Sequence, residues 1–141
     1  MAYCTLNDIQ DMMDEDEIIR FTDDTGAGTI NTDVTDKAIS GADALIDSYL
    51  ASRYSVPVTP VPDILLNFAV DIAIYKICSR RSQAPEEVRT KYEDAIKWLE
   101  KVASGKVKIS SAASAPASQS NDGPVITTSP RIFSRDSLRG F

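Results

Sequence analysis

The chain has 141 residues, a formal net charge of −6 and no histidine. This length suits one domain that can bury its own core. Without histidine, the chain lacks the commonest general base and metal ligand and every Ser-His-Asp or Cys-His arrangement. We therefore expect no enzyme and no metal site.

The cysteines and the first residues bear on the compartment. Cys4 and Cys78 are too few for a disulfide framework, which favours a reducing environment. Residues 1–5 show no basic region followed by an apolar run, so we expect no secretory signal.

Charge is unevenly distributed along the chain. Residues 1–47 carry twelve acidic and two basic side chains, whereas residues 48–141 carry nine acidic and thirteen basic ones. Two parts of opposite sign would let copies associate head to tail through two different surfaces. The alternative is that the acids only solvate exposed helix faces.

Two short helices are predicted near the start. Thr5 and Asp8 have the spacing of a capping box, and Ile9, Met12 and Met13 supply a short apolar face. A second helix should follow with acids in its first turn, where they favour the helix dipole. These acids are Asp14, Glu15, Asp16 and Glu17.

Residues 22–29 form a loop by composition. A dinucleotide loop would need glycine where Asn31 stands, and no strand precedes it. A calcium loop beginning at Asp23 would place Thr25, Ala27 and Val34 at ligand positions. Both motifs fail, so we interpret the segment as a plain connection.

Two long helices should form a hairpin. Apolar residues recur at spacings of three and four from Asp33 to about Tyr54, with Thr32 as a cap. Pro57, Pro60 and Pro62 then prescribe a stiff, extended link.

The segment Pro62–Cys78 is apolar on almost every side, which predicts a central core helix. Asp63, Asn67, Asp71 and Lys76 interrupt it, so it is not a membrane span.

A third long helix should begin at Pro85-Glu86-Glu87 and stop at Gly105. Glu87–Lys91 and Glu93–Lys97 have the spacing of ion pairs within it. Trp98 lies off its main apolar stripe and either edges the core or anchors an interface.

The composition changes after this helix. Residues 106–109 resemble a short strand, and residues 110–121 are mostly serine and alanine, which bury too little surface to form a core. We therefore expect a bundle over residues 1–106 and an extended C-terminal arm over 107–141 that becomes ordered only on assembly. The arm carries scattered apolar residues at Val125, Ile126, Ile132, Phe133, Leu138 and Phe141. The predicted fold class is all-α: a small helical bundle with two short N-terminal helices, three long helices and this arm.

Several segments together resemble a known family. They are residues 46–54, 60–62, 71–75 and 85–95, followed by Trp98-Leu99 and Gly105. Their order and spacing resemble the small neck proteins of Mu-like tailed phages, a family similar to the wider group of helical head–tail connector, or adaptor, proteins. The resemblance covers about residues 3–109.

The resemblance implies a ring of copies beneath the portal that completes the packaged head and joins it to the tail. It implies partners in the portal protein and in neighbouring neck or tail proteins, a place in the neck of the virion, and synthesis in the cytoplasm of the host bacterium. It implies no catalytic residue and no cofactor. The alternative is a small cytoplasmic regulatory module that binds another protein.

Two surfaces follow as hypotheses. The arm would bind the portal or an adjacent subunit by adding a strand through residues 125–128 and filling pockets with its apolar side chains. The acids Asp14, Glu15, Asp16 and Glu17 would face a neighbouring subunit or line a lumen through which DNA passes without specific binding. No membrane contact is expected.

Overall fold

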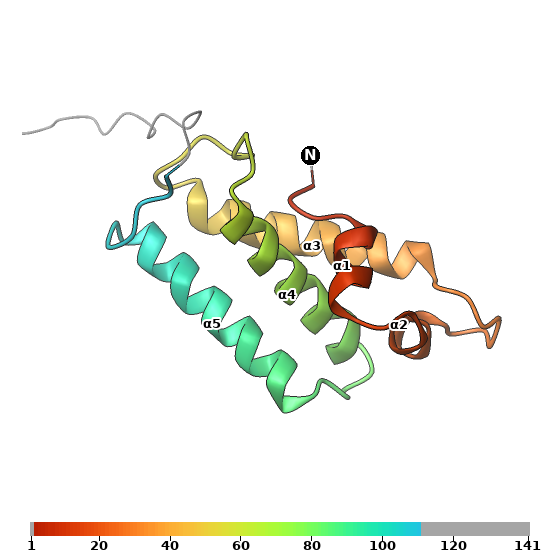
Figure 1. Cartoon of the computed structure of the whole chain (residues 1–141). Helices are drawn as coiled ribbons and strands as arrows, with labels where there is room; N and C mark the ends of the chain where they lie inside the picture. The colour runs from red at the N-terminus through yellow and green to blue at the C-terminus, as the bar shows by residue number, and fades with distance from the viewer. Residues whose placement is uncertain (1, 111–141) are drawn as a thin grey trace, which may run out of the picture.

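The computed structural model describes residues 2–110, and helix α4 (Asp63–Ser79) lies at the centre of that part (Figure 1). It contacts each of the other four helices. Its buried side chains are Leu65, Ala69, Val70, Ile72, Ala73, Ile74, Ile77 and Cys78. Because these point in most directions around the helix, α4 must be covered on most sides, and the predicted central core helix is confirmed.

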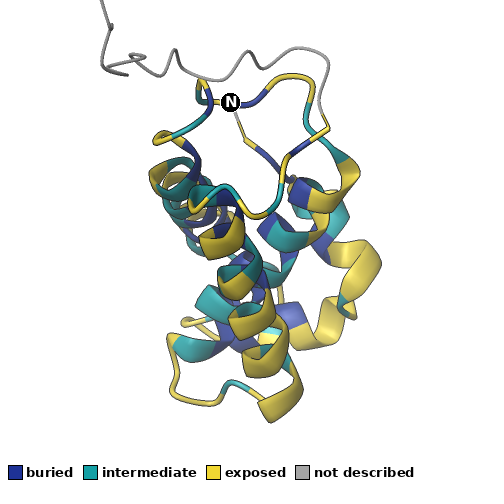
Figure 2. Cartoon of the chain, turned by 90° about the vertical axis from the view of Figure 1, so that its left-hand side faces the viewer, coloured by how far each residue is buried: buried dark blue, intermediate teal, exposed yellow. Residues whose placement is uncertain are grey.

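The other helices are α1 (Leu6–Met12), α2 (Glu15–Thr22), α3 (Thr32–Leu50) and α5 (Glu86–Ala103). Residues 2–110 contain no strand, so the all-α prediction of two short and three long helices is confirmed. Buried side chains of α3 and α5 face α4, while their outer faces are exposed (Figure 2).

Helix α3 differs from its predicted bounds at both ends. Its cap is Asn31 instead of Thr32, because the Asn31 side chain accepts a hydrogen bond from the Asp33 N–H at 3.1 Å. It ends at Leu50, after which the chain turns Tyr54 into the core. The link to α4 is not simply extended, because the backbone bends at residues 56–57 and 59–60, and Val58 between the bends is fully buried.

A buried hydroxyl fastens the first residues to this link. Tyr3 Oη donates to Asp47 at 2.5 Å and accepts from the Val58 N–H at 3.0 Å, and the Tyr3 N–H donates to Asp43 at 2.9 Å. Burial and the Asp47 hydrogen bond raise the pKa of Tyr3, so the hydroxyl keeps its proton. The N-terminal residues are thus held against α3.

Helix α1 begins with the predicted capping box, in which the Thr5 N–H donates to Asp8 at 2.7 Å and the Asp8 N–H donates to Thr5 Oγ1 at 3.4 Å. Its predicted apolar face is only partly right. Ile9 is buried, but Met12 is 59% exposed, because the helix ends at Met12 and the backbone becomes extended at Met13.

Helix α5 ends at a Schellman motif. The N–H groups of Gly105 and Lys106 donate to Val102 O and Lys101 O, and Gly105 has φ 79°, as expected for a glycine stop. The Arg53 guanidinium lies against Gly105 where any side chain would stand. The predicted strand over residues 106–109 is absent, because the Ile109 N–H donates to the buried Tyr54 hydroxyl instead of a strand partner. Ile109 is itself buried, so the packed part of the chain runs at least that far.

Two aromatic pairs join α4 to α5. Trp98 is half-buried with its ring centroid 5.0 Å from that of Phe68, and Tyr75 stacks on Tyr92 at 4.1 Å. The first pair places Trp98 at the edge of the core.

The predicted ion pairs of α5 are only partly right. Lys91 meets Glu87 at 3.3 Å as predicted, but Lys97 turns back to Asp94 and Glu93 pairs with Arg89. In the described part of the chain, no helix is long and apolar enough to cross a membrane.

Candidate functional site

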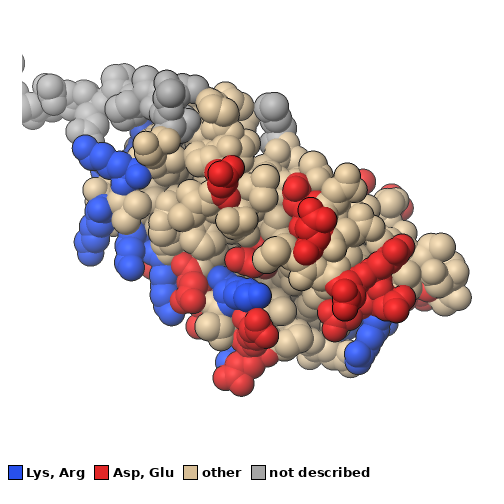
Figure 3. Space-filling view, in the orientation of Figure 1, with Lys and Arg blue, Asp and Glu red and all other residues tan. Residues whose placement is uncertain are grey.

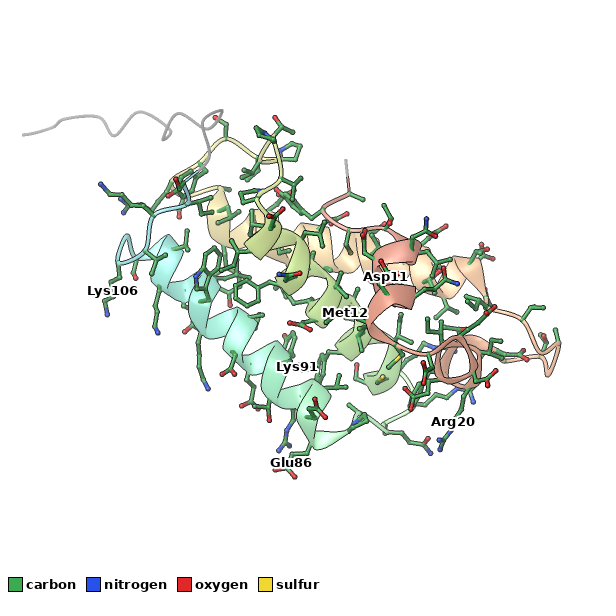
Figure 4. The ribbon with its side chains drawn as sticks, viewed as in Figure 1. Asp11, Met12, Arg20, Glu86, Lys91 and Lys106 are labelled. Carbon is green, nitrogen blue, oxygen red and sulfur yellow. The ribbon has the colours of Figure 1, made fainter. Side chains whose placement is uncertain are left out.

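The described bundle has two oppositely charged ends (Figure 3). We define the acidic end as the exposed side chains of Asp11, Asp14, Glu15, Asp16 and Glu17, on and between α1 and α2. We define the basic end as Lys97, Lys101, Lys106 and Lys108, exposed along and after the last turns of α5. Asp11 and Lys106 lie toward opposite ends of the molecule (Figure 4).

The four predicted site acids Asp14, Glu15, Asp16 and Glu17 are brought together, all exposed, at the start of α2. None of them takes part in an ion pair within residues 2–110. Their charge is therefore directed to solvent in the isolated chain.

The loop between α2 and α3 is tied to the end of α4. Asp24 forms a two-pronged ion pair with Arg80, at 2.7 and 2.8 Å, and also meets Arg81 at 2.8 Å. Arg81 donates to the Asp23 carbonyl at 2.6 Å and Arg80 to the Phe21 carbonyl at 3.2 Å. The loop is a connection, as predicted, but one with a fixed attachment.

Asp23 organises the inside of the same loop. Its carboxylate accepts the N–H groups of Thr25, Gly26 and Gly28 at 2.8–2.9 Å. The hydrogen bond from Gly28, with those of the neighbouring amides, lowers the pKa of Asp23 to about 2. Hydrogen bonds from Arg80 and then Arg81 lower the pKa of Asp24 to about 2 as well.

These pKa values give a prediction for the loop. Both carboxylates are held below their ordinary value of 3.8, so their contribution to stability is fully present above pH 4 and is lost as the pH falls through about 2. Arg80→Gln should raise the pKa of Asp24 toward 3.8 and leave that of Asp23 near 2, measured by NMR of the carboxyl carbons. Arg89→Gln, an exposed arginine of α5, should change neither; a wild-type Asp24 titrating near pH 4 would contradict the ion pairs.

A groove of about 550 Å³ lies beside the acidic end, between α1 and α2 on one side and α5 on the other. Its apolar lining consists of Met12, Met13, Phe21, Ile74, Pro85 and Val88. Its charged lining consists of Glu17, Arg20, Asp71, Glu87 and Lys91. We call this hollow the Met12 groove; Met12 and Lys91 lie on its two sides (Figure 4).

The acids of the Met12 groove outnumber its bases by three to two. Burial raises the pKa of Asp71, an effect that the nearby Lys91 opposes. Arg20 is turned toward the Phe21 ring, with its guanidinium carbon 5.7 Å from the ring centroid. The groove thus combines apolar side chains with five charged ones that sum to a charge of −1.

The two cysteines do not contribute to this site. Cys4 and Cys78 are both free and buried. Burial raises the pKa of Cys4 to about 12 and that of Cys78 to about 11, so both thiols stay protonated and serve as packing groups. Among residues 2–110, no group of three or more acidic or cysteine side chains is placed to hold a metal ion.

The predicted arm residues Val125, Ile126, Ile132, Phe133, Leu138 and Phe141 lie outside the described residues.

The sequence analysis missed two features of the described residues 2–110. The ion pairs that join Arg80 and Arg81 to Asp24 were not predicted, although two arginines directly after one helix and two aspartates directly after another are a weak signal. The Met12 groove had no signal, because four helices contribute to it.

The described residues define a small five-helix bundle with oppositely charged ends and a partly apolar groove. The chain belongs to the family described as "Bacteriophage Mu, Gp36", whose model matches residues 3–127. The match confirms the resemblance to Mu-like phage proteins and extends it beyond residue 109, into the arm.

Two relatives from Mu-type phages are also similar to this chain. The "Mu-like prophage FluMu protein gp36" of Haemophilus influenzae is 32% identical over 105 residues, which is 74% of this chain and 73% of the relative. "Gene product J" of Escherichia phage Mu is 31% identical over 137 residues, 96% of each chain. The second match includes most of residues 107–141, so that part of the sequence has a counterpart in gene product J.

Proposed function

We propose that this protein is a structural subunit of the phage particle: a head–tail connector that forms a ring beneath the portal, completes the packaged head and joins it to the tail. The observation that carries the proposal is the charge separation of a bundle belonging to a Mu phage family. A ring needs two different complementary surfaces on each subunit, and the acidic and basic ends are such a pair.

In this proposal the acidic end of one copy meets the basic end of the next. Residues 111–141 extend from the basic end and reach a neighbouring protein, either the portal or an adjacent copy. A segment that folds on binding suits ordered assembly, because it joins its partner only when that partner is in place.

The test is quantitative mass spectrometry of purified particles from a lysate that contains this protein. We expect several copies per particle, in a fixed ratio to the portal protein. Absence from intact particles, together with abundance in the soluble lysate, would discard the connector and favour a regulatory protein-binding module.

A further inference from the structure

The Met12 groove has an unusual composition for the surface of a small bundle. Met12 is 59% exposed, and Ile64, at 43%, is the other large apolar side chain that is exposed among residues 2–110. Glu17, Asp71 and Glu87 line it together with Arg20 and Lys91, and Lys91 already pairs with Glu87, so Glu17 and Asp71 are the acids without an ion pair in this lining. A ligand that fits would carry large apolar side chains with positive charges close beside them.

One segment of this chain has that chemistry. Residues 131–141 carry Ile132, Phe133, Leu138 and Phe141 among three arginines, at positions 131, 135 and 139, with a single acid at Asp136, and Phe141 follows the last arginine. Apolar and cationic side chains in one short segment match an apolar groove of net negative charge better than the neutral, serine- and alanine-rich residues 110–121 do.

The geometry of the chain favours a neighbour's groove over its own. The described chain ends at Ser110, beside the basic end, whereas the groove lies at the other end of α5, whose 18 residues span about 27 Å. From Ser110 to Arg131 the chain spans at most about 70 Å, enough for either groove. In a head-to-tail contact, however, the neighbour's acidic end and its groove lie next to the basic end from which the segment departs.

We propose that the Met12 groove binds residues 131–141 of the adjacent copy of this chain. The proposal rests on the proposed ring, in which the acidic end of one copy meets the basic end of the next. It turns each subunit contact into two linked contacts, one between bundles and one between groove and segment. Linked contacts raise the overall affinity because the second forms at high effective concentration.

The test uses full-length protein with labelled methionine methyl groups, because Met12 and Met13 both line the groove. The labelled copy carries Phe133→Ala and Phe141→Ala, which disable its own segment. Adding unlabelled wild-type chain should shift the Met12 and Met13 NMR signals. Adding unlabelled chain with the same two substitutions should shift them much less, because only the contact between bundles remains.

Matched variants of the labelled copy test whether the acidic side chains of the groove contribute to binding. Glu17→Lys should weaken the binding that shifts these signals by about three- to tenfold, since one attraction becomes a repulsion. Glu93→Lys makes the same charge change at an exposed position of α5, outside the groove lining and outside both charged ends, and should leave the binding unchanged.

Three results would overturn the proposal. Equal shifts from both donors would mean that the neighbouring bundle fills the groove. A second result is a concentration-independent difference, in dilute solution, between the Met12 and Met13 signals of labelled wild-type chain and those of the doubly substituted chain. It would mean that the groove binds the segment of its own chain. No shift at any concentration that supports association would mean that the segment binds elsewhere. None of these results bears on whether the protein is in the particle, which mass spectrometry decides separately.

Discussion

Replacing Glu15 and Asp16 by lysine should block assembly of this protein, and replacing Lys101 and Lys106 by glutamate in the same chain should restore it. Each pair is exposed, lies at one end of the bundle and forms no ion pair within residues 2–110. If the ends meet between copies, either pair alone places like charges in contact, which should weaken that contact by about a hundredfold or more. The combined variant reverses both surfaces and makes them complementary again.

The measurement is the yield of infectious particles when each variant complements a phage that lacks this gene. Asp63→Lys with Glu93→Lys is the control, because it makes the same change of charge at exposed positions outside both ends. The lysines at 15 and 16 lose a favourable interaction with the helix dipole of about 0.3–1 kcal/mol each, so circular dichroism should verify that each variant is folded.

The combined variant separates the two hypotheses for the acidic end. If the acids line a lumen and keep the DNA phosphates from binding, lysines there would retain DNA whatever the charge of α5. Failure of the combined variant to restore particles, with retention on DNA, would support the lumen and exclude the head-to-tail contact.

The sequence predicted the helices well because their signals are local. Segment 62–78 is apolar on almost every side, which predicts a helix surrounded by other helices. Helix α4 is that helix. The cap of α3 was placed one residue late because Asn31 and Thr32 are both good caps, and only the hydrogen bond to the Asp33 N–H separates them. Met12 was assigned to the core because a short helix gives too few residues to fix which face is buried.

The candidate site depends on contacts between distant residues and was less predictable. Asp24 and Arg80 are 56 positions apart, and the local sequence around one does not identify the other as its partner. The Met12 groove exists because α1 and α2 cross α4 without covering the start of α5, which depends on packing angles that periodicity does not determine. The acidic end was visible in the sequence because a capping acid and three acids in the first turn place four charges at one helix terminus.

Removing residues 111–141 should leave the bundle folded but unable to support infectious particles. Every buried side chain of the described core lies between Tyr3 and Ile109, and the Ile109 N–H keeps its hydrogen bond to Tyr54 in the shortened chain. We therefore expect the free energy of unfolding to change by less than about 1 kcal/mol. Urea unfolding followed by circular dichroism measures this directly.

The loss of function should come from the apolar side chains of the arm and not from its length. Ile132→Ser with Phe133→Ser in the full-length chain should therefore reproduce the loss of particles, because these side chains would no longer fill pockets on the partner. Ala113→Ser with Ala117→Ser, in the serine- and alanine-rich stretch, should have no effect. A normal yield of particles from the shortened chain would refute the hypothesis that residues 111–141 bind a partner during assembly. A large loss of stability in the shortened chain would show that these residues belong to the folded core.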